Sequence, residues 1–347
     1  MNTSIYYFSG TGNAKRVSEW ISNITEESGF SSKLINIDEL ASRRSIEKPD
    51  SELIGFASPT HGFNFPPIML NFLWHFPKAR KGQKAFIVNT RAGMKMGKLF
   101  LPGLSGIAQL FAALVLILKG YAIIAMKPVD MPSNWISFHP GMRQKVVASI
   151  IEKREETTKR FARKMYSGKK NYRALFDIVQ DLVIAPISLL YYAIGRFVLA
   201  KTFIASSDCI QCNLCIKNCP VNAIHYVNNR PFWSYKCESC MRCMNACPTR
   251  AIETAHGFVI TLGILLDIVG IAYLNTLLNY ENLLTSYLPK IAAVLSILAI
   301  NSVIFFVFLL IIYRLMHFLL RFKCFEKLII YSSFTKYKFW RRYKPKF

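Results

Sequence analysis

Acidic residues are scarce in this sequence: 20 Asp and Glu stand against 44 Lys and Arg, a formal net charge of +24 over 347 residues. Cysteine is absent from the first 208 residues, which excludes a disulfide framework spread through the chain. Residues 1–8 lack the basic head and apolar core of a signal peptide. Apolar residues are plentiful, and their share of 52% excludes a disordered or low-complexity chain.

The chain is long enough for two modest domains and a further segment. Composition shifts along the sequence predict where these parts begin and end. The predicted parts are a first domain at 1–165, a basic linker with an apolar segment at 166–205, a cysteine-rich module at 206–256, an apolar hairpin at 257–313 and a basic tail at 314–347.

In the first domain, short apolar runs alternate with helical patterns. The predicted strands are Thr3–Phe8, Lys33–Asp38, Leu53–Ser58, Lys84–Asn89 and Tyr121–Met126. The predicted helices are Ala14–Glu27, Pro66–Trp74, Gly103–Lys119 and Gly141–Met165. This alternation favours an α/β fold with a parallel sheet covered on both faces. Ligands of such sheets bind at the carboxyl ends of the strands.

A short glycine- and hydroxyl-rich segment follows the first predicted strand and leads into a helix. Its residues are Ser9, Gly10, Thr11, Gly12 and Asn13. Free backbone N–H groups and the helix dipole favour an anion at such a position. The segment matches neither the dinucleotide-binding glycine pattern nor a Walker loop. The structural alternative is a simple N-capping turn.

The segment Tyr6–Asn13 resembles the FMN phosphate loop of flavodoxins, and two further segments stand where that family contacts the flavin ring. These are Pro59, Thr60, His61 and Gly62 after the third strand, and Asn89, Thr90, Arg91 and Gly93 in a loop after the fourth. The resemblance implies a doubly wound parallel five-stranded sheet of order 2-1-3-4-5 that binds FMN through these residues.

Two positions depart from the flavodoxin pattern. Ala14 replaces the hydroxyl residue that usually closes the phosphate loop, and Arg91 stands where the family commonly stacks an aromatic ring on the flavin. We hypothesise that a cation at Arg91 stabilises the reduced, anionic flavin and raises its potential. The alternative is that Arg91 is a solvated surface residue.

Eight of the nine cysteines lie between residues 209 and 247, in two copies of the run C-x2-C-x2-C-x3-C-P. Thiolates in this spacing hold iron–sulfur clusters, so two complete runs predict two [4Fe–4S] clusters. Zinc is the structural alternative, but zinc sites need neither the third cysteine nor the final Cys-Pro. The ninth, Cys324, is predicted to be a free thiol.

The cysteine block resembles the two-cluster ferredoxins, a small α+β module in which the fourth cysteine of each run binds the other cluster. This resemblance implies one cluster on a first quartet and one on a second quartet. The first quartet is Cys209, Cys212, Cys215 and Cys247, and the second is Cys237, Cys240, Cys243 and Cys219.

Two long apolar stretches follow the cysteines. Residues 257–276 contain one charge, Asp267, and residues 291–313 contain none. Each is long enough to cross about 30 Å of hydrocarbon as a helix. The tail beyond them has ten basic residues and one acid. Positive charge favours the cytoplasmic side, so we expect a two-pass protein of the cell membrane with its cysteine module, first domain and C-terminus in the cytoplasm.

Three smaller membrane features carry open interpretations. Asp267 is expected to pair with a polar neighbour such as Asn301, the alternative being a proton or quinone path. The apolar runs Ala108–Leu118 and Leu182–Ile194 are too short, or interrupted by Pro186, to span a bilayer. We hypothesise that the first packs on the membrane surface or a partner and the second lies at the interface, the alternative being ordinary intramolecular packing.

Residues 1–256 together resemble a family of flavodoxin–ferredoxin fusion proteins, here with an added membrane hairpin. The resemblance implies electron transfer between two [4Fe–4S] clusters and FMN. Two alternatives remain: an iron–sulfur carrier with an apo flavodoxin-like docking domain, and a flavin-dependent reductase of a small acceptor.

Since no Ser/His/Asp or Cys/His catalytic arrangement is evident, an electron carrier is favoured over an enzyme with its own substrate. The expected partners are membrane lipid and a redox protein, with no nucleic acid. The basic cysteine module suits an acidic redox partner. The sequence sets no oligomeric state.

Overall fold

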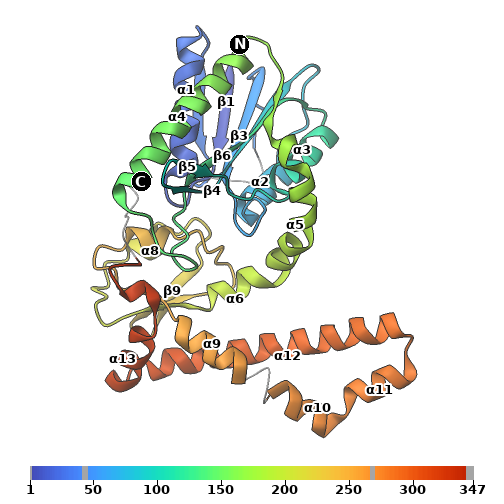
Figure 1. Cartoon of the computed structure of the whole chain (residues 1–347), viewed down its shortest axis with the longest axis vertical. Coiled ribbons are helices and arrows are strands. Elements are labelled where there is room, and N and C mark those ends of the chain that lie inside the picture. The colour runs from blue at the N-terminus through green and yellow to red at the C-terminus, as the bar shows by residue number, and fades with distance from the viewer. Residues whose placement is uncertain (1, 41–45, 266–269, 341–347) are drawn as a thin grey trace.

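The computed structural model describes residues 2–40, 46–265 and 270–340. Figure 1 shows an α/β domain at the top, a small cysteine-rich module below it, and a long helical hairpin at the bottom. The C-terminal segment returns to the cysteine-rich module.

The first domain is built on a largely parallel sheet. Its strands are β1 (Thr3–Tyr7), β2 (Ser32–Asn36), β3 (Leu53–Pro59), β4 (Lys84–Met96), β5 (Leu99–Leu101), β6 (Ala122–Pro132) and β7 (Asn171–Tyr172). The order is β2-β1-β3-β4-β6-β7, with β5 antiparallel to β4. The five predicted strands and their 2-1-3-4-5 order are confirmed, because β6 is the fifth of them. This order is that of the flavodoxin-like fold.

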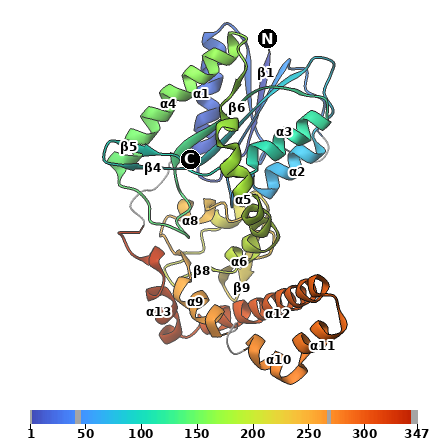
Figure 2. The same ribbon diagram turned by 45° about the vertical axis from the view of Figure 1, so that its right-hand side comes forward.

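Helices cover both faces of the sheet, as the alternating pattern predicts (Figures 1 and 2). On one face, α1 (Asn13–Glu27) and α4 (Gln144–Tyr166) pack on the sheet in a core that contains Ile21 and Phe161. On the other, α2 (Pro67–His75) and α3 (Ala108–Leu118) bury Phe72 and Leu116. The strands are therefore buried on both sides, which explains their nearly continuous apolar character.

The segment 89–93, predicted to be a loop, lies inside strand β4, so this prediction is wrong. Pairing between β4 and β6 continues past Asn89 as far as the pair Gly93 and Pro132. Arg91 stands opposite Asp130 in this register, and their ion pair keeps polar residues within the ladder. The chain turns only after Met96, where β5 folds back.

The cysteine-rich module is a small α+β unit, as predicted. Its elements are β8 (Phe203–Ala205), α7 (Leu214–Lys217), β9 (Ile224–Val227), β10 (Arg230–Trp233), α8 (Arg242–Ala246) and β11 (Ile252–Thr254). The strands form two antiparallel pairs, β9 with β10 and β8 with β11. Phe203 and Trp233 fill the core between the pairs and the cysteine loops.

One apolar helix, residues Arg173–Ala200, links the two units along the outside of the molecule (Figures 1 and 2). It comprises η1 (Arg173–Asp177), α5 (Ile178–Leu190), the π-helical η2 (Tyr191–Gly195) and α6 (Arg196–Ala200). The interruption predicted at Pro186 is wrong, since the proline lies inside α5. A proline removes one backbone hydrogen bond, but packing holds the helix: Ser188 Oγ donates to Phe63 O at 3.1 Å.

The C-terminal part is helical. Its elements are α9 (His256–Leu265), α10 (Ala272–Leu278), α11 (Tyr280–Tyr287), α12 (Lys290–Leu319), α13 (Lys323–Tyr331) and η4 (Phe334–Lys336). The second predicted span, 291–313, lies within α12, which has 30 residues and is about 45 Å long. In the first predicted span, α9 and α10 flank residues 266–269, and Asp267 therefore lies outside the described residues.

Two helices of the described chain are long and apolar enough to cross a membrane: α12 and the apolar helix Arg173–Ala200. This test rests on length and composition alone. In both views α12 lies across the bottom of the molecule, whereas α5 descends beside the α/β domain (Figures 1 and 2). They run in different directions, so only one can follow the normal of a single bilayer.

The basic tail packs on the cysteine-rich module. Glu326, its one acid, pairs with Arg230 at 3.1 Å and accepts a hydrogen bond from the Ser207 N–H. Thr335 Oγ1 accepts from the Thr254 N–H at 3.0 Å. Trp340 Nε1 donates to Ile136 O, so the tail also reaches the loop after β6.

Candidate functional site

A pocket lies at the carboxyl ends of the central strands, where the α/β domain meets the cysteine-rich module. We call it the loop pocket, and it encloses about 90 Å³. Nine of the residues predicted to contact flavin line it: Ser9, Gly10, Thr11, Asn13, Pro59, Thr60, His61, Thr90 and Arg91. Four do not line it: Gly12, Gly62, Asn89 and Gly93. The unpredicted lining includes the loop after β6 and two residues of the cysteine-rich module, Cys240 and Met241.

The phosphate-type loop opens directly into α1. Gly12 caps the helix with φ +90°, a conformation that glycine adopts without strain. In the backbone hydrogen bonds of the described residues, Gly10, Thr11 and Gly12 donate none. The first turn of α1 contains no acid. Free N–H groups at a helix N-terminus without acids make an anion site, and so the loop fits a phosphate.

A tight hairpin supplies the opposite wall. Gly62 and Phe63 both have positive φ, and His61 and Asn64 exchange backbone hydrogen bonds of 2.8 and 3.2 Å across the turn. Burial lowers the pKa of His61 to about 4, opposed by a hydrogen bond to the backbone of Glu238. His61 is therefore neutral at pH 7. Its Nδ1 atom is buried with no partner in the described chain, which leaves it available to a ligand.

Trp135, in the loop after β6, supplies an aromatic ring that was not predicted from the sequence. It lies parallel to His61, with ring centroids 6.2 Å apart and 14° between the planes. A planar ring system between them would need about 7 Å, two contacts of about 3.5 Å, so the rings must move apart before a flavin can enter. The flavodoxin resemblance implies an aromatic ring after the fourth predicted strand, whereas this tryptophan follows the fifth.

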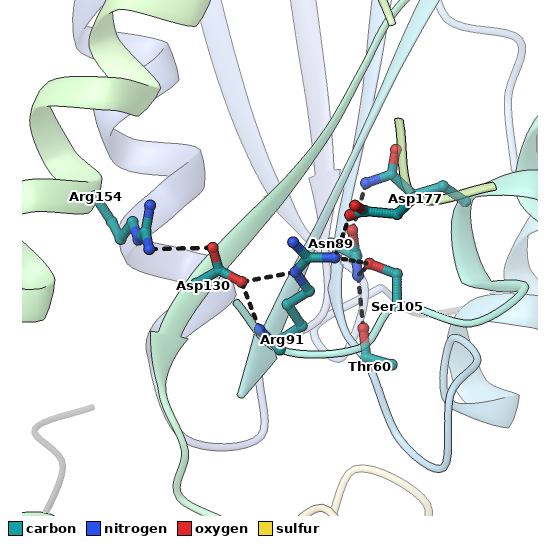
Figure 3. Close-up of polar contacts among 9 residues, drawn as sticks. Thr60, Asn89, Arg91, Ser105, Asp130, Arg154 and Asp177 are labelled. Atoms are coloured by element: carbon teal, nitrogen blue, oxygen red, sulfur yellow. Dashed lines mark hydrogen bonds and ion pairs between the residues drawn. The ribbon is translucent and has the colours of Figure 1, made fainter. Parts of the chain in front are cut away.

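Arg91 is buried at the centre of an ion-pair network (Figure 3). Its Nε lies 2.7 Å from Asp130 and its NH1 lies 2.6 Å from Asp177, while Arg154 also pairs with Asp130 at 3.2 Å. Burial acts to lower the pKa of Arg91, but the two carboxylates outweigh it and raise that pKa. The surface alternative is thus wrong. Two cations face two carboxylates, so the hypothesis of an uncompensated positive charge beside a flavin loses its basis.

Three predicted contacts hold the walls rather than lining the pocket. Asn89 Nδ2 donates to Thr60 Oγ1 at 2.7 Å and to Ser105 Oγ at 3.0 Å (Figure 3), which positions Thr60. A side chain on Gly93 would collide with Asp130, and one on Gly62 with the ring of Tyr191. These glycines permit close packing of β4 on β6 and of the hairpin on the apolar helix.

The eight cysteines gather in the two predicted groups. A narrow cavity is lined by the whole first quartet. Burial, followed by the charge of Cys209, raises the pKa of Cys215 to about 11. In the second quartet, burial raises the pKa of Cys240 to about 12 and raises the pKa of Cys243 well above its usual value, with Cys219 adding to both. Buried thiolates require a nearby cation, which an iron cluster supplies.

The backbone around both quartets has the form of a cluster-binding loop. Gln211 and Asn213 have positive φ in the first run, and Ser239 and Met241 have positive φ at the same positions of the second. Such alternation turns successive N–H groups inward and builds concavities found at iron–sulfur sites. The Ser239 N–H donates to Cys237 Sγ at 3.4 Å, as expected around a thiolate.

A single metal ion fits this arrangement poorly. In the part of the chain that the structure describes, no three His, Cys, Asp or Glu side chains converge closely enough to hold one ion. Zinc holds thiolates at about 2.3 Å, and hence within about 4 Å of each other. Four iron atoms bridged by sulfide accept four separately held thiolates, which the two quartets offer.

Contacts between the two units centre on Arg242 of α8. Its guanidinium donates to Ser9 O at 2.7 Å and to Gly10 O at 3.4 Å, and it pairs with Asp38. Trp135 Nε1 donates to Ser239 O at 3.2 Å. The second quartet therefore lies against the loop pocket, where Cys240 forms part of the wall. In the first quartet, by contrast, Cys212 is exposed.

Comparison with known proteins supports the prediction of iron–sulfur clusters in the cysteine-rich module. Residues 208–252 match the 4Fe-4S dicluster domain family, and no curated protein matches the chain. Similar solved structures include rubredoxin oxygen:oxidoreductase from Desulfovibrio gigas (16% identity, TM-score 0.33, 48% of this chain and 36% of that one). A flavodoxin from the domain Archaea (14%, TM-score 0.31, 47% and 98%) and flavodoxin 1 from Bacillus cereus (15%, TM-score 0.30, 46% and 98%) are also similar. The chain thus joins a flavodoxin-like fold, given by its strand order, to a 4Fe–4S dicluster module.

Proposed function

We propose that this protein is a membrane-attached electron carrier that holds FMN in the loop pocket and two [4Fe–4S] clusters on the two quartets. One observation supports the proposal: Cys240, a predicted ligand of the second cluster, lines the same pocket as the phosphate-type loop. A cluster bound there would lie in direct contact with a bound flavin. FMN exchanges electrons singly or in pairs, whereas each cluster carries one.

The chain's own residues have defined roles in this proposal. The N–H groups of Gly10 to Gly12 hold the phosphate, supported by the helix dipole of α1. His61 and Trp135 would hold the flavin ring between them once their own rings move apart. His61 stays neutral at working pH, so its free Nδ1 offers a hydrogen bond without adding charge.

The difference in exposure between the two quartets supports an order of electron transfer. The second quartet lies at the interface with the α/β domain, where Ser239 and Arg242 dock on the other unit. The first quartet includes the exposed Cys212, flanked by the exposed apolar side chain of Ile210. The order is therefore FMN, second cluster, first cluster, and then a partner redox protein that docks at the exposed end. The basic charge of the chain suits an acidic partner.

Membrane attachment rests on α12 together with the rest of the apolar hairpin 257–313, to which it belongs. The apolar length of α12 is sufficient to cross a bilayer. Its end at Leu319 packs beside the cysteine module, where Tyr313 Oη donates to Phe203 O at 3.0 Å. We assign both redox units and the basic tail to the cytoplasmic side of the cell membrane because of the positive charge of the tail.

The experiment follows electrons from a protein donor too large to enter the loop pocket. Reduced ferredoxin is mixed anaerobically with the full chain, and bleaching of bound FMN is recorded. Cys212→Ser removes a ligand of the first cluster and should slow bleaching at unchanged FMN content, while Cys324→Ser should have no effect. Equal bleaching rates in the Cys212→Ser variant and the native chain would refute the proposed route.

A further inference from the structure

A second, larger cavity lies on the outer side of the hairpin that walls the loop pocket. It is open to solvent and has a volume of about 500 Å³, within the range of about 300–1,000 Å³ for small-molecule sites. Its walls come from α2, α3 and the apolar helix, and most of its lining is apolar. Trp74, Phe111 and Tyr192 contribute aromatic rings, one from each of these three elements. We call it the aromatic cavity.

One cation in the aromatic cavity has unused hydrogen-bonding capacity. Arg196 lines the cavity, and its Nε is buried without a hydrogen-bond partner. The guanidinium stacks on the rings of Tyr192, at 4.5 Å, and Phe197, at 4.4 Å. Among the ion pairs of the described residues, none involves Arg196. The Nε atom is closed off from the cavity, so a ligand there would accept from the terminal nitrogens of the guanidinium, which form no ion pair with the described residues.

The aromatic cavity and the loop pocket share a wall. The hairpin runs from His61 in the loop pocket to Asn64 in the aromatic cavity. Tyr191 packs on Gly62 and meets the ring of Trp135 edge-on at 5.8 Å, while its neighbour Tyr192 faces the aromatic cavity. Both tyrosines belong to the π-helical turn η2, a helix irregularity often found at functional sites.

The cavity is accessible from an apolar surface. Phe176, Val179 and Val183 of the apolar helix are between 73% and 82% exposed, and Trp74 at the cavity is 65% exposed. The apolar helix lies along the outside of the molecule in both views (Figures 1 and 2). A membrane-attached protein with such a surface can admit a ligand directly from the lipid phase.

We propose that the aromatic cavity binds a lipid-soluble quinone. The quinone ring packs among Trp74, Phe111 and Tyr192, one carbonyl oxygen accepts a hydrogen bond from Arg196, and the isoprenoid tail leaves past Leu189. The inference rests on the proposed function for its electrons: a reduced flavin would supply two electrons and release its own protons to water, and the quinone would take the electrons with two protons from water to become the quinol. A planar ring with carbonyl acceptors matches aromatic walls and one donor better than a bulky phospholipid headgroup does.

The test is photoaffinity labelling of the full-length protein in phosphatidylcholine nanodiscs. The probe is an azido-quinone with one isoprene unit, competed by the same quinone without the azide. We expect saturable labelling of peptides that contain Trp74, Phe111 or Tyr192. Arg196→Gln should weaken binding about tenfold, because a hydrogen bond to a charged donor is lost. Leu189→Trp, which fills the cavity, should weaken quinone binding without changing the charge of the cavity.

A matched control is Arg173→Gln. Arg173 belongs to the same helix and also stacks on an aromatic ring, that of Phe176 at 5.6 Å, but it does not line the cavity. Labelling that does not saturate, or that falls equally in Arg173→Gln and Arg196→Gln, would overturn the proposal. The proposal would also be overturned if labelling in phosphatidylglycerol nanodiscs were abolished as fully as by the quinone competitor, because the occupant would then be an anionic lipid.

The same samples separate this inference from the proposed function. Bound FMN and iron are quantified in each preparation. Saturable labelling without FMN would support the cavity as a quinone site and refute the flavin as the electron source. FMN and iron without labelling would refute the quinone site and leave the electron-transfer proposal standing.

Discussion

Replacing Arg91 by methionine should destabilise the α/β domain by about 3 kcal/mol. The guanidinium is 7% exposed and holds Asp130 at 2.7 Å, Asp177 at 2.6 Å and Ser105 Oγ at 3.2 Å. Removing one partner of a buried ion pair costs about 3–5 kcal/mol. The lower end applies because Asp130 keeps Arg154, and Asp177, whose side chain is 31% exposed, can be hydrated.

The assay is urea unfolding of the native and variant chains, followed by tryptophan fluorescence and compared at the midpoint of the α/β transition. Arg80→Met serves as the matched control. Arg80 pairs with Asp50 on the surface, where the side chains are 48% and 89% exposed, so its loss should cost less than about 1 kcal/mol. Equal small effects of both substitutions would refute the buried network.

The Arg91→Met variant also tests whether the charges around Arg91 compensate each other beside the flavin. Arg91 and Arg154 face Asp130 and Asp177, so the network is close to neutral and contributes little field at the pocket. Arg91→Met removes one cation from this network and leaves a net negative charge beside the pocket, so the FMN midpoint potential should fall. The double variant Arg91→Met/Asp130→Asn keeps Arg154 against Asp177 and should leave the potential nearly unchanged. A fall as large in the double variant as in Arg91→Met would contradict this account.

Three other predictions address the interface and the cofactors. Arg242→Gln removes the donor to Ser9 and Gly10 and should raise the FMN dissociation constant at least about tenfold, measured by flavin fluorescence; an unchanged constant would contradict it. His61 binds no proton in the folded state above a pKa of about 4, whereas the unfolded side chain protonates near pH 6.5. Stability should thus fall by about 3 kcal/mol as pH drops from 6.5 to 4, and His61→Gln should flatten this slope in urea unfolding. Lys201 is buried near Cys237, so Lys201→Met should lower the midpoint potential of the second cluster in an EPR redox titration; a rise would refute the assignment.

The sheet and the cysteine groups could be predicted because their signals are local. Continuous apolar runs separated by helical patterns fix a parallel sheet, and two identical cysteine spacings define two ligand runs. The same local conformation recurs in both runs, with Asn213 and Met241 at matching positive φ values. The flavodoxin-like strand order agrees with what the phosphate-type loop implies.

The remaining features depend on partners distant in sequence. The β4 extension exists because Arg91 meets Asp130, which lies 39 residues away. Trp135 is held at the pocket by residues far away in sequence, among them Ser239 of the cysteine-rich module and Tyr191 of the apolar helix. Pro186 is tolerated because the hairpin at Phe63 supports the helix. The local sequence does not encode such contacts. The flavodoxin resemblance therefore implied a loop at 89–93, and Pro186 predicted an interruption of the helix.

The most direct test of the central claim is the iron, acid-labile sulfide and FMN content per chain after anaerobic purification of the full-length protein. Two cubane clusters and one flavin predict about eight iron, about eight sulfide and about one FMN per chain. Zinc in place of iron, or a full complement of iron with no FMN after reconstitution with excess flavin, would contradict the account.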